Sequence, residues 1–304
     1  MRSIARFAMR GPQYAVLTAS GFLLGSLKVL LLLIPSGGIL SLTTMRHGGL
    51  EGLKLMVMAS IVCGLFAELA FSRGLPVVAL CTASMLPPWI MALKLKRSED
   101  PGRAVSVSAY LVAAYAITVR LNVEDVGAFW LARLEPIFDF AAQQTGQPFP
   151  QDQVLIIANS VHGWLLAMMC LVFTSMLFLG RWWQSSLYNP GGFGNEFRGF
   201  RVPHGVQYAA LALAVIYLAL RTTNSPGLQL LGDFAVILAF LYALQGLAVV
   251  HSRAKQISLA RGWLTGLYVM LVIAPYPAAA ILVFTGLADN VFDFRGRRKI
   301  ESKL

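Results

Sequence analysis

The feature that most constrains this chain is a series of apolar stretches that recurs along its length. Each provides close to the roughly 20 apolar residues that a helix needs to cross a bilayer. The stretches lie at 13–34, 50–71, 74–93, 104–121, 153–180, 204–221, 228–250 and 262–288. Only 13% of the residues are charged, whereas a soluble domain has about a quarter. The pattern therefore predicts an all-α, polytopic transmembrane helical bundle.

Several other classes of protein fit the sequence poorly. The three cysteines have neither CxxC nor Cys–His spacing, so we expect neither a disulfide framework nor a metal site. The net charge of +11 could indicate nucleic acid, but basic loops beside a membrane explain it better. The four histidines are scattered, and no nucleophile is paired with a base. We therefore predict that the chain is not an enzyme and has no cofactor.

The charges between the stretches predict an orientation. Basic residues dominate the N-terminal tail, 94–103, the Gly/Arg loop 181–204, 251–261 and the tail 288–304, so these segments are predicted to be cytoplasmic. Both termini are then cytoplasmic. The basic N-terminus leads into a long apolar run without a cleavage site, which indicates an uncleaved first span and not a signal peptide.

The segment 122–152 is acidic instead and is predicted to lie outside. Its apolar residues fall on one helical stripe, and Asn122 followed by Asp125 resembles a capping arrangement at the start. We expect an amphipathic helix on the outer leaflet, with a bend at Pro136.

The number of spans must agree with this orientation. Single spans at both ends of the chain would place basic segments outside. Residues 11–48 and 257–294 are each interrupted near the middle, at 35–38 and 275–277, so each is expected to form a pair of short or broken helices. We predict eight to ten membrane segments in one integral membrane domain, 1–304. Broken helices often frame transporter sites, but a proline kink without function fits equally well.

The densest candidate site is in the predicted cytoplasmic loop. Its residues are Asn189, Gly191, Gly192, Gly194, Glu196, Arg198 and Arg201. Glycines beside arginines could bind an anion through backbone N–H groups, but the Lys-Ser or Lys-Thr of a nucleotide-binding loop is missing. The alternative is a tight re-entry loop in which Glu196 pairs with Arg198 or Arg201.

Two further motifs follow in the last third of the chain. Gln245 and His251 are six residues apart and therefore sit on different faces of one helix; His251 fits an interfacial cation. Asp289 and Asp293 share a face beside Arg295, which indicates structural salt bridges, a cation site, or a lock between loop and tail.

Polar residues inside apolar stretches are candidates for a buried site. Asn159 and His162 are three apart on one helical face, and together with Gln245 they are the candidate substrate-binding residues. A hydrogen bond between packed helices is the alternative interpretation.

Three motifs together resemble the YybS-like family of predicted bacterial membrane proteins. They are NPGGFGNEFRGFR at 189–201, QGLAVVH at 245–251 and GLADNVFDFR at 286–295. That family is thought to be distantly similar to the S subunits of energy-coupling-factor vitamin transporters. The resemblance implies a bundle in the bacterial cytoplasmic (inner) membrane, with an outward-facing small-molecule pocket and a membrane-protein partner. It also implies that Ala15 and Ala19, which have the matching spacing, contact that partner.

Two functions remain open on this basis. The first is capture or transport of a small molecule or lipid, by a transporter or a transporter subunit. The second is a non-transporting scaffold that binds a protein partner through its cytoplasmic loop and basic tail.

Overall fold

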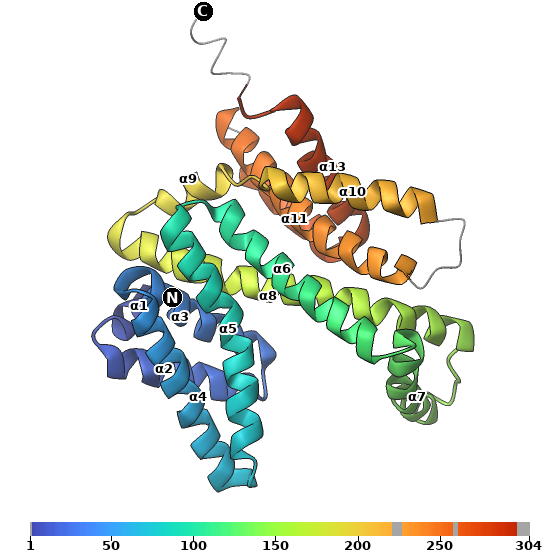
Figure 1. Ribbon diagram of the computed structural model, residues 1–304, viewed down its shortest axis with the longest axis horizontal. Coiled ribbons are helices and arrows are strands. Elements are labelled where there is room, and N and C mark those ends of the chain that lie inside the picture. Colours follow the sequence, from blue (N-terminus) through green and yellow to red (C-terminus); the bar gives the residue numbers. More distant parts are fainter. Residues whose placement is uncertain (1, 221–226, 258–260, 297–304) are drawn as a thin grey trace, which may run out of the picture. The chain divides into compact units, whose positions relative to one another are not determined.

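The computed structural model describes residues 2–220, 227–257 and 261–296. These residues form thirteen α-helices and one short 3-10 turn, and contain no strand (Figure 1). The prediction of an all-α chain is therefore confirmed. The backbone gathers into two compact units. Unit 1 comprises Met1–Ser108, Leu171–Pro203 and Leu241–Leu304, and unit 2 comprises Ala109–Cys170 and His204–Phe240.

Most helices lie entirely within one of the two units, and three long helices contribute to both. Unit 1 contains α1 (Arg2–Ala8), α2 (Pro12–Ser26), the 3-10 turn η1 (Leu30–Leu32), α3 (Leu33–His47), α4 (Gly49–Phe71), α5 (Gly74–Ser98), α9 (Gly192–Arg198), α12 (Arg261–Ile273) and α13 (Pro275–Phe292). Unit 2 contains α7 (Val126–Thr145) and α10 (His204–Leu220). The long helices α6 (Pro101–Asn122), α8 (Gln151–Tyr188) and α11 (Gly227–Gln256) contribute to both units.

Five helices are long and apolar enough to cross a membrane, namely α4, α5, α6, α8 and α11. By length and composition, these helices are those of a membrane protein, as predicted. The longest, α8, has 38 residues, or about 57 Å at 1.5 Å per residue, which exceeds the roughly 30 Å hydrocarbon layer. The predicted stretch 153–180 was thus too short, and the predicted loop 181–204 begins as helix.

The N-terminal break does not lie where the sequence suggested. Helix α2 ends at Ser26 and α3 begins at Leu33, so the interruption covers residues 27–32 and not 35–38. Pro35 lies in the first turn of α3, where a missing N–H removes no helical hydrogen bond. The exposed Lys28 lies in the connection between the two helices.

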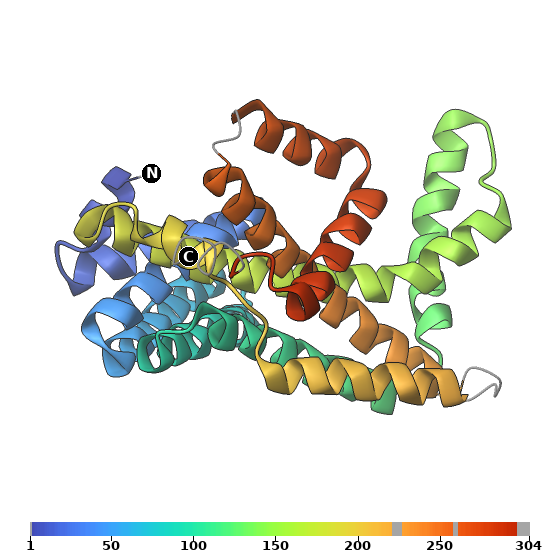
Figure 2. The same ribbon diagram turned by 90° about the horizontal axis from the view of Figure 1, so that it is seen from above.

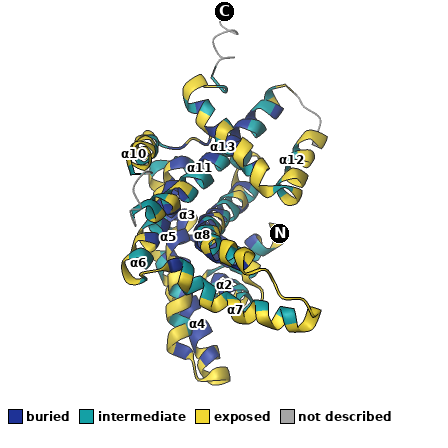
Figure 3. Ribbon diagram, turned by 90° about the vertical axis from the view of Figure 1, so that its right-hand side faces the viewer, coloured by how far each residue is buried: buried dark blue, intermediate teal, exposed yellow. Residues whose placement is uncertain are grey.

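The glycines mistaken for a break pack α3 into the interior of unit 1. All residues of α3 from Ser36 to Met45 are buried (Figure 3). A Cβ atom on Gly180 of α8 would lie 2.7 Å from the carbonyl oxygen of Gly38. The two helices therefore meet backbone to backbone, and a side chain at this crossing would separate them.

The C-terminal break lies at Ala274, directly before the predicted position 275–277. Helix α12 ends at Ile273, and α13 begins at Pro275 after a sharp bend (Figure 2). The basic residues Arg297, Arg298, Lys299 and Lys303 of the predicted tail lie outside the described residues.

The acidic segment of unit 2 forms a helix, as predicted. Asp125 is the N-cap residue of α7, and its side chain accepts a hydrogen bond from the Ala128 N–H at 2.9 Å. Asn122 is not part of this cap, because it is the last residue of α6 and donates to the Thr118 carbonyl. Pro136 lies inside α7 without ending it.

Candidate functional site

The three motifs meet in unit 1, where Gln245 connects them. Its side chain is completely buried. The side-chain oxygen accepts a hydrogen bond from the Val202 N–H at 2.8 Å. The amide nitrogen lies 3.1 Å from the Gly286 carbonyl and 2.8 Å from the Asn290 side-chain oxygen. Each polar atom of Gln245 thus satisfies a group of its own chain.

Arg295 forms the second connection in this junction. It pairs with the fully buried Asp289 at 2.5 Å, and only 7% of the Arg295 side chain is exposed. The same guanidinium donates to the carbonyls of Arg198 and Phe200 at 3.0 and 2.8 Å. Nearby, Arg201 pairs with Asp293 on the surface. These contacts are structural salt bridges, one of the alternatives drawn from the sequence, and they also join the loop to the tail.

The surface pair shifts the titration of Asp293. The hydrogen bond from Arg201 lowers the pKa of this carboxyl below its usual value, and the charges of Arg201 and Arg295 act in the same direction. About half of each side chain in the pair remains exposed, so solvent screens the interaction.

Two glycines allow the helices of the junction to approach closely. A Cβ atom on Gly246 of α11 would overlap the Leu282 carbonyl of α13, and one on Gly286 would overlap the Tyr242 carbonyl of α11. The set of contacts around Gln245 depends on this short separation. By contrast, nothing lies within 4 Å of a Cβ atom built on Gly262 or Gly266.

The glycine-rich segment itself does not form an open anion cradle. Its N–H groups at Gly192, Phe193 and Asn195 bond to Asn189, Ser185 and Gly191 of the same region. Gly191 has the positive φ of 87° that a glycine adopts without strain. Gly194 lies in α9, where an added Cβ would approach the Arg198 side chain.

Glu196 does not have the partner predicted for it. It pairs with Arg181 of α8, while Arg198 donates to the side chain of Asn195. The reason is geometric, because the helical start of the predicted loop brings Arg181 alongside α9. The rings of Phe193, Phe197 and Phe200 surround Phe178 of α8, with centroids 5.5 to 6.5 Å away.

The remaining predicted residues of unit 1 lie elsewhere. The Nε2 atom of His251 is 2.8 Å from the Tyr268 hydroxyl of α12. Ala15 and Ala19 are 5% and 1% exposed and pack inside the unit, where Ser36 donates to the Ala19 carbonyl. In this structure the two alanines therefore contact the chain's own helices.

Unit 2 contains a buried charged cluster around Asp233. Arg120 of α6 binds this carboxylate with two nitrogens, at 2.8 and 3.0 Å. His162 of α8 is also buried, and its Nε2 atom lies 3.6 Å from Asp233, beyond hydrogen-bonding distance. That nitrogen has no hydrogen-bond partner in the described part of the chain. The ring of Tyr115 stacks beside His162 at 6.3 Å.

The sequence reasoning found only part of this cluster. Asn159, proposed to act with His162, is exposed and donates to the Leu155 carbonyl of its own helix. Arg120 and Asp233 were not among the candidates drawn from the sequence. The sequence does contain a signal for these two residues, because Arg120 is the only charged residue of the apolar stretch 104–121 and Asp233 the only one of 228–250.

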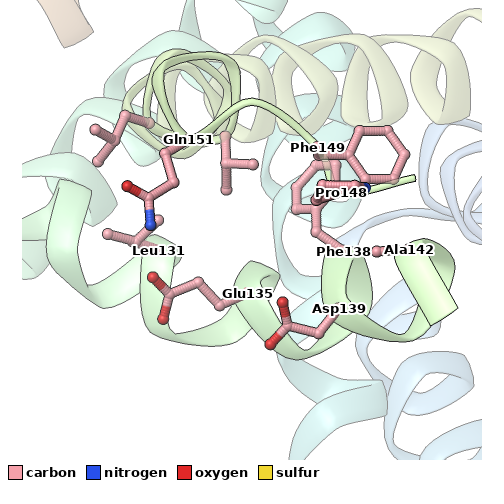
Figure 4. A pocket seen from close by; sticks show the side chains of 10 residues that line it. Leu131, Glu135, Phe138, Asp139, Ala142, Pro148, Phe149 and Gln151 are labelled. Atoms are coloured by element: carbon pink, nitrogen blue, oxygen red, sulfur yellow. The ribbon is translucent and has the colours of Figure 1, made fainter. Parts of the chain in front are cut away.

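A pocket of about 490 Å³ lies between α7 and the beginning of α8, within unit 2. Figure 4 shows Glu135 and Asp139 of α7 on one side, and Gln151 with the preceding Pro148 and Phe149 on the other. The ring of Phe149 also meets that of Phe138 edge to face, with centroids 5.0 Å apart. Carboxylates beside aromatic rings suit a cationic ligand.

Among the described residues, no group of three His, Cys, Asp or Glu side chains could hold a metal ion. No family model, no curated protein and no solved structure matches this chain. The resemblance to the YybS-like family therefore stays a prediction.

Proposed function

We propose that this chain captures a small molecule and acts as a transporter or transporter subunit in the bacterial cytoplasmic membrane. It would cross that membrane with eight to ten segments and keep both termini in the cytoplasm. The resemblance to the YybS-like family supports the same class of function.

The observation that carries this proposal is the buried cluster of Arg120, His162 and Asp233. Ionisable groups inside membrane helices are costly and commonly line paths for substrates or ions. Arg120 and Asp233 compensate each other, whereas the buried Nε2 atom of His162 has no hydrogen-bond partner among the residues that the structure describes. Such a nitrogen is suited to bind a proton or a polar ligand group.

The pocket beside α7 supports a more specific ligand class. Its volume falls in the range of sites for small organic molecules. With Glu135 and Asp139 on its wall, it favours an amine or another organic cation.

Native mass spectrometry of the protein purified gently from its own membranes tests for capture. We expect a bound small molecule. The fraction of protein that carries it should fall in a Glu135→Gln, Asp139→Asn variant and stay unchanged in Glu124→Gln, which changes an acid outside the pocket. Absence of any bound molecule, together with no thermal shift across a panel of biogenic amines, would contradict capture.

Transport is tested in proteoliposomes that contain a pH-sensitive dye, with the same amines as probes. Wild type and the surface variant Asp152→Asn should give a saturable signal, while His162→Gln and Asp233→Asn should lose most of it. His162→Gln leaves the Arg120–Asp233 pair intact, so its effect would not reflect a broken ion pair.

One observation favours the scaffold as a second function. Arg198, Arg201 and Arg295 line a hollow of about 360 Å³ in unit 1, which fits an acidic segment of a partner protein. Site-specific crosslinking from position 195, which also lines the hollow, should capture one defined partner. Arg198→Gln should abolish that capture without affecting membrane insertion, whereas Arg103→Gln should not.

A further inference from the structure

A second pocket, of about 420 Å³, lies within unit 1 where four helices meet. It is formed by the turn between α1 and α2, the end of α3 and the first turns of α4. Met9, Val16, Leu55 and Met58 give it an apolar wall. The sequence analysis did not identify this pocket, because its residues are spread over four helices.

The opposite wall is polar and has an excess of positive charge. Lys54 and Glu51 pair at 2.7 Å and compensate each other. Arg10 also lines the pocket, and no ion pair in the described part of the chain involves it. Helices α2 and α4 begin at this pocket and α1 and α3 end at it, so their dipoles oppose one another. The positive charge of Arg10 therefore makes the pocket favour an anion.

Thr43 of α3 also lines the pocket and is only 7% exposed. Its hydroxyl oxygen has no hydrogen-bond partner among the described residues, but the oxygen itself is fully buried, so a molecule in the pocket would contact the rest of the side chain and not this oxygen.

An apolar track leads away from the charged wall along α4. Lys54, Met58, Ile61 and Leu65 follow one another at helical spacing and share one face. The three apolar side chains of this track are 53%, 46% and 61% exposed. One face of α4 can therefore bind an anionic group at Lys54 and an apolar chain along the three residues that follow.

We propose that this pocket binds an anionic phospholipid. The phosphate lies between Arg10 and Lys54, and an acyl chain follows Met58, Ile61 and Leu65. All of these residues belong to unit 1, and the lipid site does not depend on the proposed capture of a small molecule.

Titration of the full-length protein in detergent, followed by native mass spectrometry, tests this proposal. The probes are dioctanoyl phosphatidylglycerol, dioctanoyl phosphatidylcholine and inorganic phosphate. Phosphatidylglycerol should bind at least about fivefold more tightly than phosphatidylcholine, the factor expected for one basic residue near an anionic headgroup. Inorganic phosphate should not displace it at equal concentration. Equal binding of the two lipids, or displacement by phosphate alone, would overturn the proposal.

Matched variants separate a specific site from general attraction to the basic protein. Arg10→Gln should weaken phosphatidylglycerol binding by about fivefold, whereas Lys28→Gln, which removes an exposed cation elsewhere in unit 1, should not. Unchanged lipid affinity in Arg10→Gln would refute the site.

Discussion

The contacts at the junction of the three motifs predict that Arg295 and Arg201 contribute very differently to the stability of the fold. Arg295→Met would leave the Asp289 carboxylate fully buried without its counter-ion and would remove the donors to two backbone carbonyls. Breaking a buried pair in this way costs about 3–5 kcal/mol. The matched change Arg201→Met breaks a pair that is about half exposed, and such pairs contribute at most about 1 kcal/mol.

The two variants can be compared by unfolding in mixed micelles with increasing sodium dodecyl sulfate. Tryptophan fluorescence is a suitable signal because Trp183 is fully buried in unit 1. Combining Asp289→Asn with Arg295→Met should recover part of the loss, with a coupling free energy above about 1 kcal/mol. Equal losses for the two arginine variants, or strictly additive effects of the changes at 289 and 295, would refute this reasoning.

Three further outcomes are expected. Gly286→Ala should destabilise the protein by about 1–3 kcal/mol because the methyl group has no space. Gly266→Ala should be neutral or stabilising in the same titration with sodium dodecyl sulfate. Equal effects of the two changes would contradict the close helix crossing. Asp125→Ala should destabilise the start of α7 by about 1 kcal/mol, seen as faster hydrogen exchange in its first turn, and unchanged exchange would argue against the cap. The pKa of Asp293 is lowered in the folded state by Arg201, so the pair stabilises the fold above the ordinary aspartate pKa and loses this contribution as the pH falls through the lowered value. The stability advantage of wild type over Asp293→Asn should be at most about 1 kcal/mol at neutral pH and disappear in acid, and an advantage that grows in acid would reverse the assigned sign.

Much of the helical architecture could be predicted because its signals are local. The apolar stretch 50–71 corresponds to α4, whose observed bounds are Gly49–Phe71. The Asp125 cap is also local, since its acceptor and donor are three residues apart. The break assigned to 35–38 was wrong for a physical reason. Glycine suits both an interrupted helix and a close contact between two helices, and only the packing of Gly38 against α8 distinguishes them.

The candidate sites were harder to predict because they depend on distant contacts. Arg120 and Asp233 are 113 residues apart, and each alone resembles a residue at a membrane interface. Gln245 was correctly singled out as a buried polar residue, but its hydrogen bonds go to its own chain, 41 to 45 residues away. The sequence indicates which polar residues are costly to bury, whereas their partners are determined by the tertiary fold.

The lock between the two segments also has a consequence for biosynthesis. The carbonyls of Arg198 and Phe200 precede their donor, Arg295, by 97 and 95 residues. At about 5–20 residues per second, a ribosome needs roughly 5 to 20 s to synthesise that intervening length. During this interval the earlier segment has been made while its guanidinium partner has not. Ribosomes that stall before codon 295 would therefore hold a nascent chain whose junction is still open to proteases.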